Sequence, residues 1–498
     1  MFEAFLAGAG TVLTWKGMLY ASIGATVGYV FGFLPGLGAS VAVSLIIPIT
    51  YGMTPMYAMI MLAGVLGGIS FGGSITSIVI NTPGEGANAA TCLDGYAMAQ
   101  QGRAGEALGA SAASGFLGHA LGIIVLIAII PAMQKLVLFF GPPEWFALGV
   151  GGLCLIAAVS GGSLLGGIIS GAAGLLLSMH GVNPVVGSPR FTFGQMWLWD
   201  GVPLLCLIIG IMALAEMIVL FTEQESISKS GTVNMGGVWS GVRETLKRLP
   251  LVVLAGMQGV VIGAIPGVGG NVSSWIAYAQ AKAMSKHPET FGKGNIEGVI
   301  GPESANDSVQ AGALMPLLSL GIPGSPSTAV LLGGLIMHGL NPGQEMLQQN
   351  LDVVFALTTA HLFGSLVTVT IGLWAAKYFA YVTTISSRIL VPMVSVLCLM
   401  GTYATRGRVS DIAMTIIFTV VGYAMIKCNI PRVPMILGLI LGPLVERSYQ
   451  VCMQLSDGSL SIFLTRPITV VFLSLIPVSL FASKIFGLFR PKKKNQTS

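Results

Sequence analysis

The sequence predicts an all-α polytopic membrane protein built from two related halves, and three observations lead to this prediction. Of the 498 residues, 54% are hydrophobic and 9% are charged, whereas soluble domains carry about 25% charged residues. Apolar runs long enough to cross about 30 Å of hydrocarbon recur along the chain. One glycine-proline pattern occurs twice, as Gly28-x3-Gly32-x2-Pro35-Gly36-x-Gly38 and Gly259-x3-Gly263-x2-Pro266-Gly267-x-Gly269.

The apolar runs mark the expected membrane crossings. Runs that suit a spanning helix lie at 17–34, 57–80, 108–131, 145–180, 201–221, 249–265, 353–376, 410–426 and 465–488. The run at 145–180 is long enough for two spans hinged at Gly161-Gly162, and shorter apolar runs are candidates for spans or re-entrant hairpins. We therefore expect roughly ten to fourteen crossings. The first residues lack the basic region of a secretory signal, so we expect the first span to be retained.

A polar loop at 222–248 divides the chain into the two predicted halves. We expect residues 1–221 to form a first transport repeat, and residues 249–498 to form a second repeat with additional C-terminal helices. Lys and Arg collect in the cytoplasmic loops of membrane proteins, so the basic loop and the basic tail at 490–494 are both expected in the cytoplasm. Transporter repeats are inverted or parallel; we expect inverted repeats, although the uncertain number of spans leaves the orientation open.

A second proline-glycine site follows the first in each half. Asn81-Thr82-Pro83-Gly84 corresponds to Gly321-Ile322-Pro323-Gly324, and we name residues 81–88 the first tip and residues 321–328 the second tip. Proline removes an amide donor and glycine permits positive φ, so both sites should break a helix. Corresponding breaks in two halves indicate the substrate site of a transporter. The paired glycines upstream suit close helix packing instead.

The two tips form the predicted substrate site. Amides at the start of a helix, together with hydroxyl and amide side chains, can bind carboxylates. In the second tip, Ser325 is the expected N-cap of a helix that begins at Pro326. The predicted substrate-binding residues are Ser74, Asn81, Thr82, Pro83, Gly84, Asn88, Pro323, Gly324, Ser325, Ser327 and Thr328.

A cation site is predicted from carbonyls freed by the breaks and from the segment that starts at Pro302. Glu303 and Asp307 share one helix face beside an apolar run, where carboxylates are costly and mark function. For Glu303 a position at the membrane interface is equally open, and Asp307 is favoured as a cation or proton ligand. The predicted cation-binding residues are Pro35, Gly36, Gly38, Ser40, Pro266, Gly267, Gly269, Asn271, Asn306 and Asp307.

Other chemistry finds little support in the sequence. Gly267-Val268-Gly269-Gly270 lacks the Lys and Ser/Thr of a phosphate loop, which disfavours an ATP-driven pump. We expect no catalytic residue, no cofactor and no metal beyond sodium. Isolated histidines such as His119 and His361 are expected to pack or to lie at interfaces. A channel with a glycine-rich filter and a membrane-embedded enzyme stay open as alternatives, the latter without an acid-base-nucleophile set.

Five long motifs are spread along the chain: Gly32-Phe33-Leu34-Pro35-Gly36-Leu37-Gly38, Asn81-Thr82-Pro83-Gly84-Glu85-Gly86, the segment 94–107, Pro302-Glu303-Ser304-Ala305-Asn306-Asp307 and Leu320-Gly321-Ile322-Pro323-Gly324-Ser325. With them, essentially the whole chain resembles the large membrane subunit of tripartite tricarboxylate transporters, the TctA family. Three positions depart from the family pattern: Ala97 stands where proline is frequent, Gly301 where alanine is frequent, and Asp307 where asparagine is common.

The resemblance implies a secondary transporter of the bacterial inner membrane. Such a subunit imports an organic di- or tricarboxylate on a sodium or proton gradient. A periplasmic binding protein delivers the carboxylate, and a small four-helix membrane subunit assists. Because Asp307 adds a negative charge beside the predicted site, the resemblance does not fix the ion stoichiometry or the substrate charge.

Overall fold

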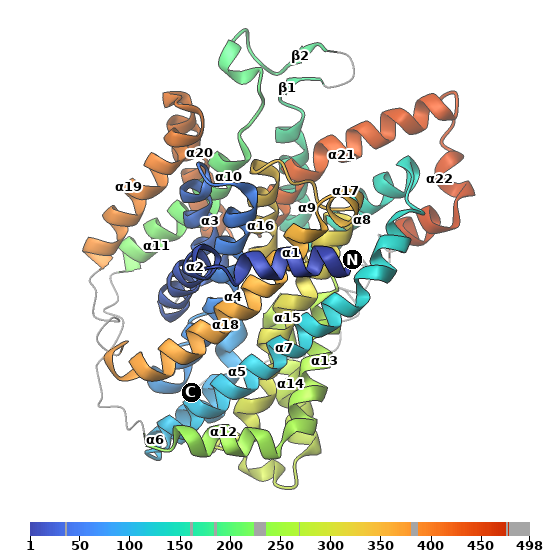
Figure 1. Cartoon of the computed structure of the whole chain (residues 1–498). Coiled ribbons are helices and arrows are strands. Elements are labelled where there is room, and N and C mark those ends of the chain that lie inside the picture. Colours follow the sequence, from blue (N-terminus) through green and yellow to red (C-terminus); the bar gives the residue numbers. More distant parts are fainter. Residues whose placement is uncertain are drawn as a thin grey trace, which may run out of the picture. The chain divides into compact units, whose positions relative to one another are not determined.

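Helices make up almost all of the regular structure (Figure 1). The computed structural model describes residues 1–34, 37–159, 163–183, 187–223, 236–267, 269–379, 387–474 and 477. The strands in these ranges are β1 (Gly181–Val182) and β2 (Pro189–Arg190), which pair antiparallel. The prediction of an all-α protein is therefore confirmed. The chain forms two compact units, Met1–Leu138 with Leu205–Tyr423, and Phe139–Leu204 with Ala424–Ser498.

Five helical segments in the described ranges are long and apolar enough to cross a membrane: Pro55–Ile80, Ala104–Val137, Leu204–Thr222, Leu351–Trp374 and Val409–Lys427. Helices α12 (Val238–Lys247) and α13 (Leu249–Gly263) meet at 80° and add a sixth if they form one broken span. Four shorter helices are also apolar. The chain is thus a polytopic membrane protein, and a larger number of crossings stays a prediction.

The larger unit contains most of the helices, and α10 and α20 extend across its boundaries. Its elements are α1 (Phe2–Val12), α2 (Trp15–Phe33), α3 (Gly38–Thr50), α4 (Pro55–Ile80), η1 (Gly86–Asn88), α5 (Ala89–Thr91), η2 (Cys92–Tyr96), α6 (Ala97–Gln100), α7 (Ala104–Val137), α10 (Leu204–Ile208), η4 (Ile209–Leu214), α11 (Ala215–Glu223), α12, α13, α14 (Gly269–Met284), η5 (Pro288–Thr290), α15 (Glu297–Leu320), α16 (Pro326–Met337), α17 (Gln344–Gln348), α18 (Leu351–Phe379), α19 (Ser387–Arg406) and α20 (Val409–Lys427).

The smaller unit contains α8 (Pro142–Val159), α9 (Leu164–Ser178), β1, β2, η3 (Met196–Leu198), α21 (Val433–Leu455) and α22 (Ile462–Thr465). The long apolar run at 145–180 divides into α8 and α9, as predicted, while the expected hinge at Gly161-Gly162 lies outside the described residues. Helix α9 packs on α21 through glycines, and Arg190 binds the Glu446 carboxylate with N–O distances of 2.7 and 3.0 Å.

The repeated glycines bring two helix pairs into close contact. Helix α2 packs on α4, and α13 packs on α15 in the same manner (Figure 1). A Cβ atom at Gly28 or Gly32 would overlap a backbone carbonyl of α4, and one at Gly259 or Gly263 would overlap a backbone carbonyl of α15. Only glycine allows backbones to approach this closely. The duplicated sequence pattern thus corresponds to a duplicated packing arrangement.

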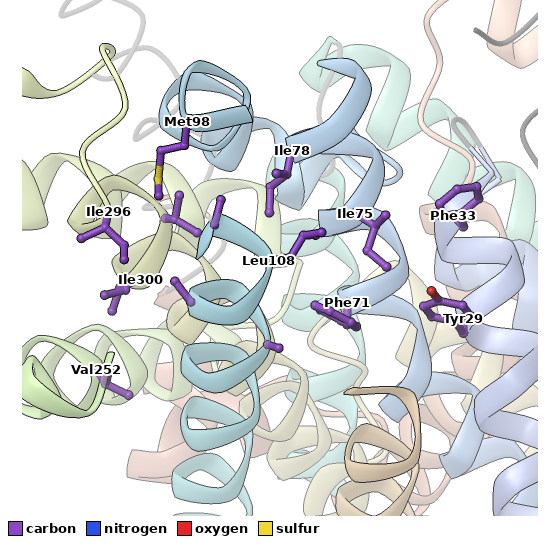
Figure 2. Close-up of a cluster of buried hydrophobic side chains, with 14 residues drawn as sticks. Tyr29, Phe33, Phe71, Ile75, Ile78, Met98, Leu108, Val252, Ile296 and Ile300 are labelled. Carbon is purple, nitrogen blue, oxygen red and sulfur yellow. The ribbon is translucent and has the colours of Figure 1, made fainter. Parts of the chain in front are cut away.

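Helices from both sides of the loop at 222–248 share one hydrophobic core. Figure 2 shows Tyr29 of α2, Phe71 of α4 and Leu108 of α7 in a cluster that also contains Val252 of α13 and Ile300 of α15. All five side chains are buried. The larger unit therefore combines segments from the two predicted repeats. The loop itself is described only up to Glu223 and again from Gly236.

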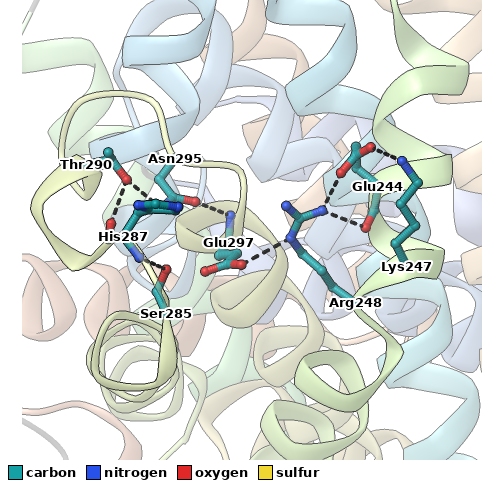
Figure 3. Close-up of polar contacts among 8 residues, drawn as sticks. All are labelled: Glu244, Lys247, Arg248, Ser285, His287, Thr290, Asn295 and Glu297. Carbon is teal, nitrogen blue, oxygen red and sulfur yellow. Dashed lines mark hydrogen bonds and ion pairs between the residues drawn. The ribbon is translucent and has the colours of Figure 1, made fainter.

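Polar contacts join the beginnings of α13 and α15 (Figure 3). Arg248 donates from Nε to Glu297 at 3.1 Å and pairs through Nη1 with Glu244. Lys247 also pairs with Glu244, at 2.6 Å. These side chains are partly exposed, and such pairs contribute about 0.2–1 kcal/mol each. They orient the helix ends more than they stabilise the fold.

Asp94 fastens the segment after the first tip to the second half of the chain. Its buried carboxylate accepts hydrogen bonds from the Tyr278 hydroxyl at 2.8 Å, the Gly294 amide at 2.9 Å and the Asn295 amide at 2.8 Å. Gly298 packs directly on the same carboxylate. The segment 94–106 is therefore tied to the second half of the chain by hydrogen bonds.

We predict that Asp94→Ala destabilises the protein by about 3 kcal/mol or more, because each buried donor left without an acceptor costs about 1–3 kcal/mol. Thermal unfolding of the detergent-solubilised protein measures the loss. Glu289→Ala is the control, since this side chain is 67% exposed. Equal unfolding temperatures for the two variants would contradict the assignment.

Candidate functional site

The two tips have the same backbone construction. Helix α4 ends at Asn81 with φ of 56°, and α15 ends at Gly321 with φ of 68°. The next amides, of Thr82 and Ile322, each donate back to a carbonyl in the last turns of the preceding helix, at 3.3 and 3.2 Å. Left-handed residues of this kind end helices by satisfying their last carbonyls. The breaks predicted at both sites are therefore present.

The glycine that follows the proline in each tip lies against the helix before the first break. A Cβ at Gly84 would overlap the carbonyl oxygen of Gly32, and a Cβ at Gly324 would overlap that of Gly263. The Gly84 amide also donates to the Gly73 carbonyl at 3.4 Å. The Gly84 amide is therefore engaged, and both glycines are packing positions.

The polar side chains of the second tip bind one another. Ser325 caps α16, as predicted: the Thr328 amide donates to its hydroxyl at 3.3 Å, and the Ser325 amide donates to the Thr328 hydroxyl at 2.9 Å. The Ser327 hydroxyl lies 3.0 Å from that of Ser325. These groups are buried, as are Pro323 and Gly324. In this conformation the predicted substrate ligands of the second tip are satisfied within the tip.

The first tip is more open at its beginning. Asn81 is exposed, and Thr82 and Pro83 are half-buried, with the Thr82 hydroxyl donating to the Ile80 carbonyl at 3.2 Å. Asn88, at the end of the tip, is buried and donates through Nδ2 to the Ser74 hydroxyl at 3.0 Å. The first tip thus connects an accessible edge to a buried polar centre.

Glu303 is the centre of that buried cluster. Its carboxyl group accepts hydrogen bonds from hydroxyls on three separate elements. The donors are Ser74 of α4 at 2.5 Å, Ser111 of α7 at 3.0 Å, and Thr91 of α5. Glu303 is only 1% exposed, and the three hydroxyl residues are buried. Three convergent hydroxyls stabilise a buried carboxylate that would otherwise be costly. The open question about Glu303 is answered in favour of a buried position.

Asn306 and Asp307 lie beside this cluster on the same helix. Asp307 is buried, and its carboxyl group lies on the Cα of Gly115, where a Cβ would collide with it. Asn306 is fully buried, and neither atom of its amide has a hydrogen-bond partner in the described structure. A Cβ at Gly270 would lie 3.0 Å from the Asn306 oxygen. An unpartnered buried amide therefore faces the beginning of α14.

The beginnings of α14 and α3 meet the first tip from two directions. Asn271, which is exposed, lies next to Gly86 of the tip, where a Cβ would be 2.9 Å from its side-chain amide. On the other side, Glu85 of the tip accepts the Ala39 amide at 2.5 Å, so its carboxylate caps the start of α3. One helix start is occupied by a carboxylate of the chain itself.

The remaining predicted cation residues are placed as follows. Gly38 and Gly269 begin α3 and α14 with φ of 43° and 65°, and the Gly267 amide donates to the Gly324 carbonyl at 3.1 Å. Ser40 and Pro266 are half-buried. Pro35 and Gly36 lie outside the described residues.

The structure thus groups the predicted substrate-binding and cation-binding residues differently from the sequence analysis. Ser74 and Asn88, predicted for the substrate, share a cluster with Glu303, one turn from Asp307. Sequence reasoning missed Glu85, Thr91 and Ser111. Glu85 had a signal, because it is an acidic residue directly after a predicted break, whereas isolated hydroxyls in apolar helices give none.

These features define a multi-pass membrane protein of the transporter type, with paired proline-glycine breaks, the first of which adjoins a buried carboxyl group. The chain belongs to the tripartite tricarboxylate transporter TctA family, which it matches over residues 18–437.

Two relatives come from Agrobacterium vitis. An uncharacterised 52.8 kDa protein in the TAR-I ttuC' 3′ region is 34% identical over 468 residues, covering 94% of this chain and 93% of the relative. An uncharacterised protein in the TAR-II ttuC' 3′ region is 33% identical over 217 residues, covering 44% of this chain and 90% of the relative. No solved structure matches the chain.

Proposed function

We propose that this chain is the translocating subunit of a secondary active transporter that imports an organic di- or tricarboxylate with sodium ions or protons. The family match supports a tricarboxylate transporter component. The observation that carries the proposal is the position of Glu303 and Asp307, two carboxyl groups buried one helical turn apart beneath the first tip. Buried carboxyl groups at membrane depth mark ion pathways.

Electrostatics links cation and substrate at such a site. Two like charges about 4 Å apart repel by about 4 kcal/mol at the effective dielectric of a partly buried site. A carboxylate substrate therefore binds poorly beside an ionised Asp307. A cation bound at Asp307 removes this repulsion, so substrate and cation bind best together. This mutual dependence couples the ion gradient to substrate import.

The beginning of α14 is the proposed position of a substrate carboxylate. Helix starts attract anions through unpaired amides and the helix dipole, and the buried Asn306 side chain faces this start without a partner. The equivalent start of α3 already holds the Glu85 carboxylate. Asn81 and Thr82, at the accessible edge of the first tip, complete the proposed substrate path.

The proposed partners follow from the family. A periplasmic solute-binding protein would deliver the carboxylate, and a small four-helix membrane subunit would assemble with this chain in the bacterial inner membrane. The family name, tripartite tricarboxylate transporter, supports this proposal.

Uptake in proteoliposomes tests the proposal. The chain, reconstituted with the small subunit and the binding protein encoded beside it, is expected to accumulate one of the radiolabelled carboxylates citrate, malate or succinate against its gradient. Collapse of the ion gradient should stop accumulation. Flux that runs only downhill would instead favour the channel alternative, and chemical conversion of the carboxylate would favour an enzyme.

A further inference from the structure

Two buried histidines face each other at the contact between α7 and α18. The ring centroids of His119 and His361 lie 4.3 Å apart, with the ring planes at 83°. Both residues are 0% exposed. In the described structure no hydrogen bond of good geometry reaches any of their four ring nitrogens, and the backbone of Leu66 on α4 is a polar neighbour of His361. Buried polar groups without partners are rare, and each calls for an explanation.

The histidine pair continues a row of polar groups that begins at Glu303. Ser111, Gly115 and His119 follow one another at four-residue intervals on α7, so they share one face of the helix. The Ser111 hydroxyl donates to Glu303, and the Asp307 carboxyl group packs against Gly115. The next position on this face is His119. Each step advances about 6 Å along the helix.

At Gly115, α7 contributes no side chain to this row. Gly115 has no side chain, so nothing on α7 separates the Asp307 carboxyl group from the turn that carries His119. Farther along, Gly122 lies on Ala311 and Ser308, the residues of α15 that follow Asp307. The Asp307 carboxyl group, at the contact of α7 with α15, therefore lies one turn of α7 before the histidine pair, at the contact of α7 with α18.

Other ionisable groups lie farther from the pair. Helix α4 contributes only Tyr57, near its beginning, and the charged residues of α12 meet α7 near Glu106, more than three turns from His119. The remaining ionisable groups among the described side chains of the elements that pack on α7 or α18 are Glu3 on α1, Lys16, Tyr20 and Tyr29 on α2, Asp94 and Tyr96 on η2, Lys135 on α7, Arg248 beside α13, Glu297 on α15, Glu345 on α17 and Asp352 on α18. Asp307 is the carboxyl group nearest to His119 along α7.

We infer that the coupling ion is a proton, and that Asp307 and the His119–His361 pair carry it; this inference rests on the proposed ion-coupled import. A proton on the Asp307 carboxyl group passes to a ring nitrogen of His119. Asp307 becomes a carboxylate and His119 an imidazolium, and the proton then moves to His361. No bond other than these N–H and O–H bonds changes.

The chemistry of the ligands favours a proton over sodium for this part of the row. Imidazole is a proton acceptor near neutral pH, whereas hard cations are bound by carboxylate, carbonyl and water oxygens. The two imidazole side chains offer nitrogen atoms and no oxygen ligand. They do offer two proton positions in direct contact, one turn of α7 beyond the residue against which the Asp307 carboxyl group lies.

The test separates uphill uptake from exchange. In sodium-free proteoliposomes with an imposed pH gradient, His119→Gln and His361→Gln should lower uphill uptake of radiolabelled citrate by about a hundredfold, the scale on which a positioned proton carrier acts. Exchange of internal for external citrate needs no net proton movement and should persist. If citrate is not carried, malate is used in the same way. His287→Gln is the matched control, because this histidine is 74% exposed.

A second measurement uses the unchanged protein. A pH-sensitive dye inside the vesicles should report one or more protons entering with each citrate. Uphill uptake that requires sodium, moves no protons or is unchanged in His119→Gln and His361→Gln would overturn the inference. Absence of both uptake and exchange in the wild-type protein with every carboxylate tested would instead refute the proposed function.

Discussion

Replacing Glu303 by glutamine is expected to abolish uphill carboxylate uptake in a protein that still folds, whereas replacing it by leucine is expected to prevent folding. Glutamine keeps the shape of the side chain, and the hydroxyls of Ser111 and Thr91 can turn to meet its amide. Glutamine removes a negative charge that the proposed binding and release of the coupling cation requires. Leucine leaves the buried hydroxyls of Ser111 and Thr91 without their acceptor, at about 1–3 kcal/mol each, while Ser74 keeps the Ser70 carbonyl. This loss is a large share of a typical total stability of about 5–15 kcal/mol.

Size-exclusion chromatography of the solubilised variants reports folding, and proteoliposome uptake reports function. Glu297→Gln is the matched control, because it lies at the start of the same helix, bonds to Arg248 and is partly exposed. We expect this control to fold and to transport normally. Uphill uptake at the wild-type rate by Glu303→Gln would remove Glu303 from the transport site and leave it a structural role.

The second large effect is expected at the tip glycines. Alanine at Gly84 or Gly324 would bring its Cβ into the carbonyl oxygen of Gly32 or Gly263. Because a backbone carbonyl cannot move aside without shifting its helix, we expect each substitution to destabilise the protein by about 1–3 kcal/mol or more. Thermal unfolding in detergent measures the effect.

Gly10→Ala and Gly52→Ala serve as controls, since a Cβ at either position would meet nothing within 4 Å. Wild-type stability with lost transport in Gly84→Ala would show that the tip glycine acts on the ligand and does not serve packing. The prediction that the tips bind the substrate is better tested at other positions. Asn81 and Thr82 lie at the accessible edge of the first tip, so their substitution probes ligand binding without disturbing this helix contact.

The polar groups of the two tips form hydrogen bonds with different partners. The second tip bonds its own hydroxyls in the capping box of Ser325 and Thr328, while the first tip sends Glu85 to α3 and Asn88 to Ser74. A duplicated sequence pattern therefore produces unequal sites. Only the first tip is connected by hydrogen bonds, through Asn88 and Ser74, to the buried carboxyl group of Glu303 among the described residues.

Much of the architecture was readable from local properties of the sequence. Composition establishes the membrane class, because a bilayer demands long apolar helices. Proline and glycine establish where α4 and α15 end, because they alter the backbone where they stand. The Ser325 cap is equally local. The duplication was visible because close helix packing requires glycine at fixed spacing.

Only the tertiary structure decided which of these features meet. Glu303 accepts hydrogen bonds from Ser74, Thr91 and Ser111 on three other elements. The His119 ring contacts that of His361, on a helix far along the chain. Such partnerships depend on how helices cross, and the crossings depend on the packing of many small contacts at once. The sequence by itself determined the helices, their breaks and the chemical groups available. The packing of α4, α7, α15 and α18 determined which carboxyl, hydroxyl and imidazole groups lie along one face of α7.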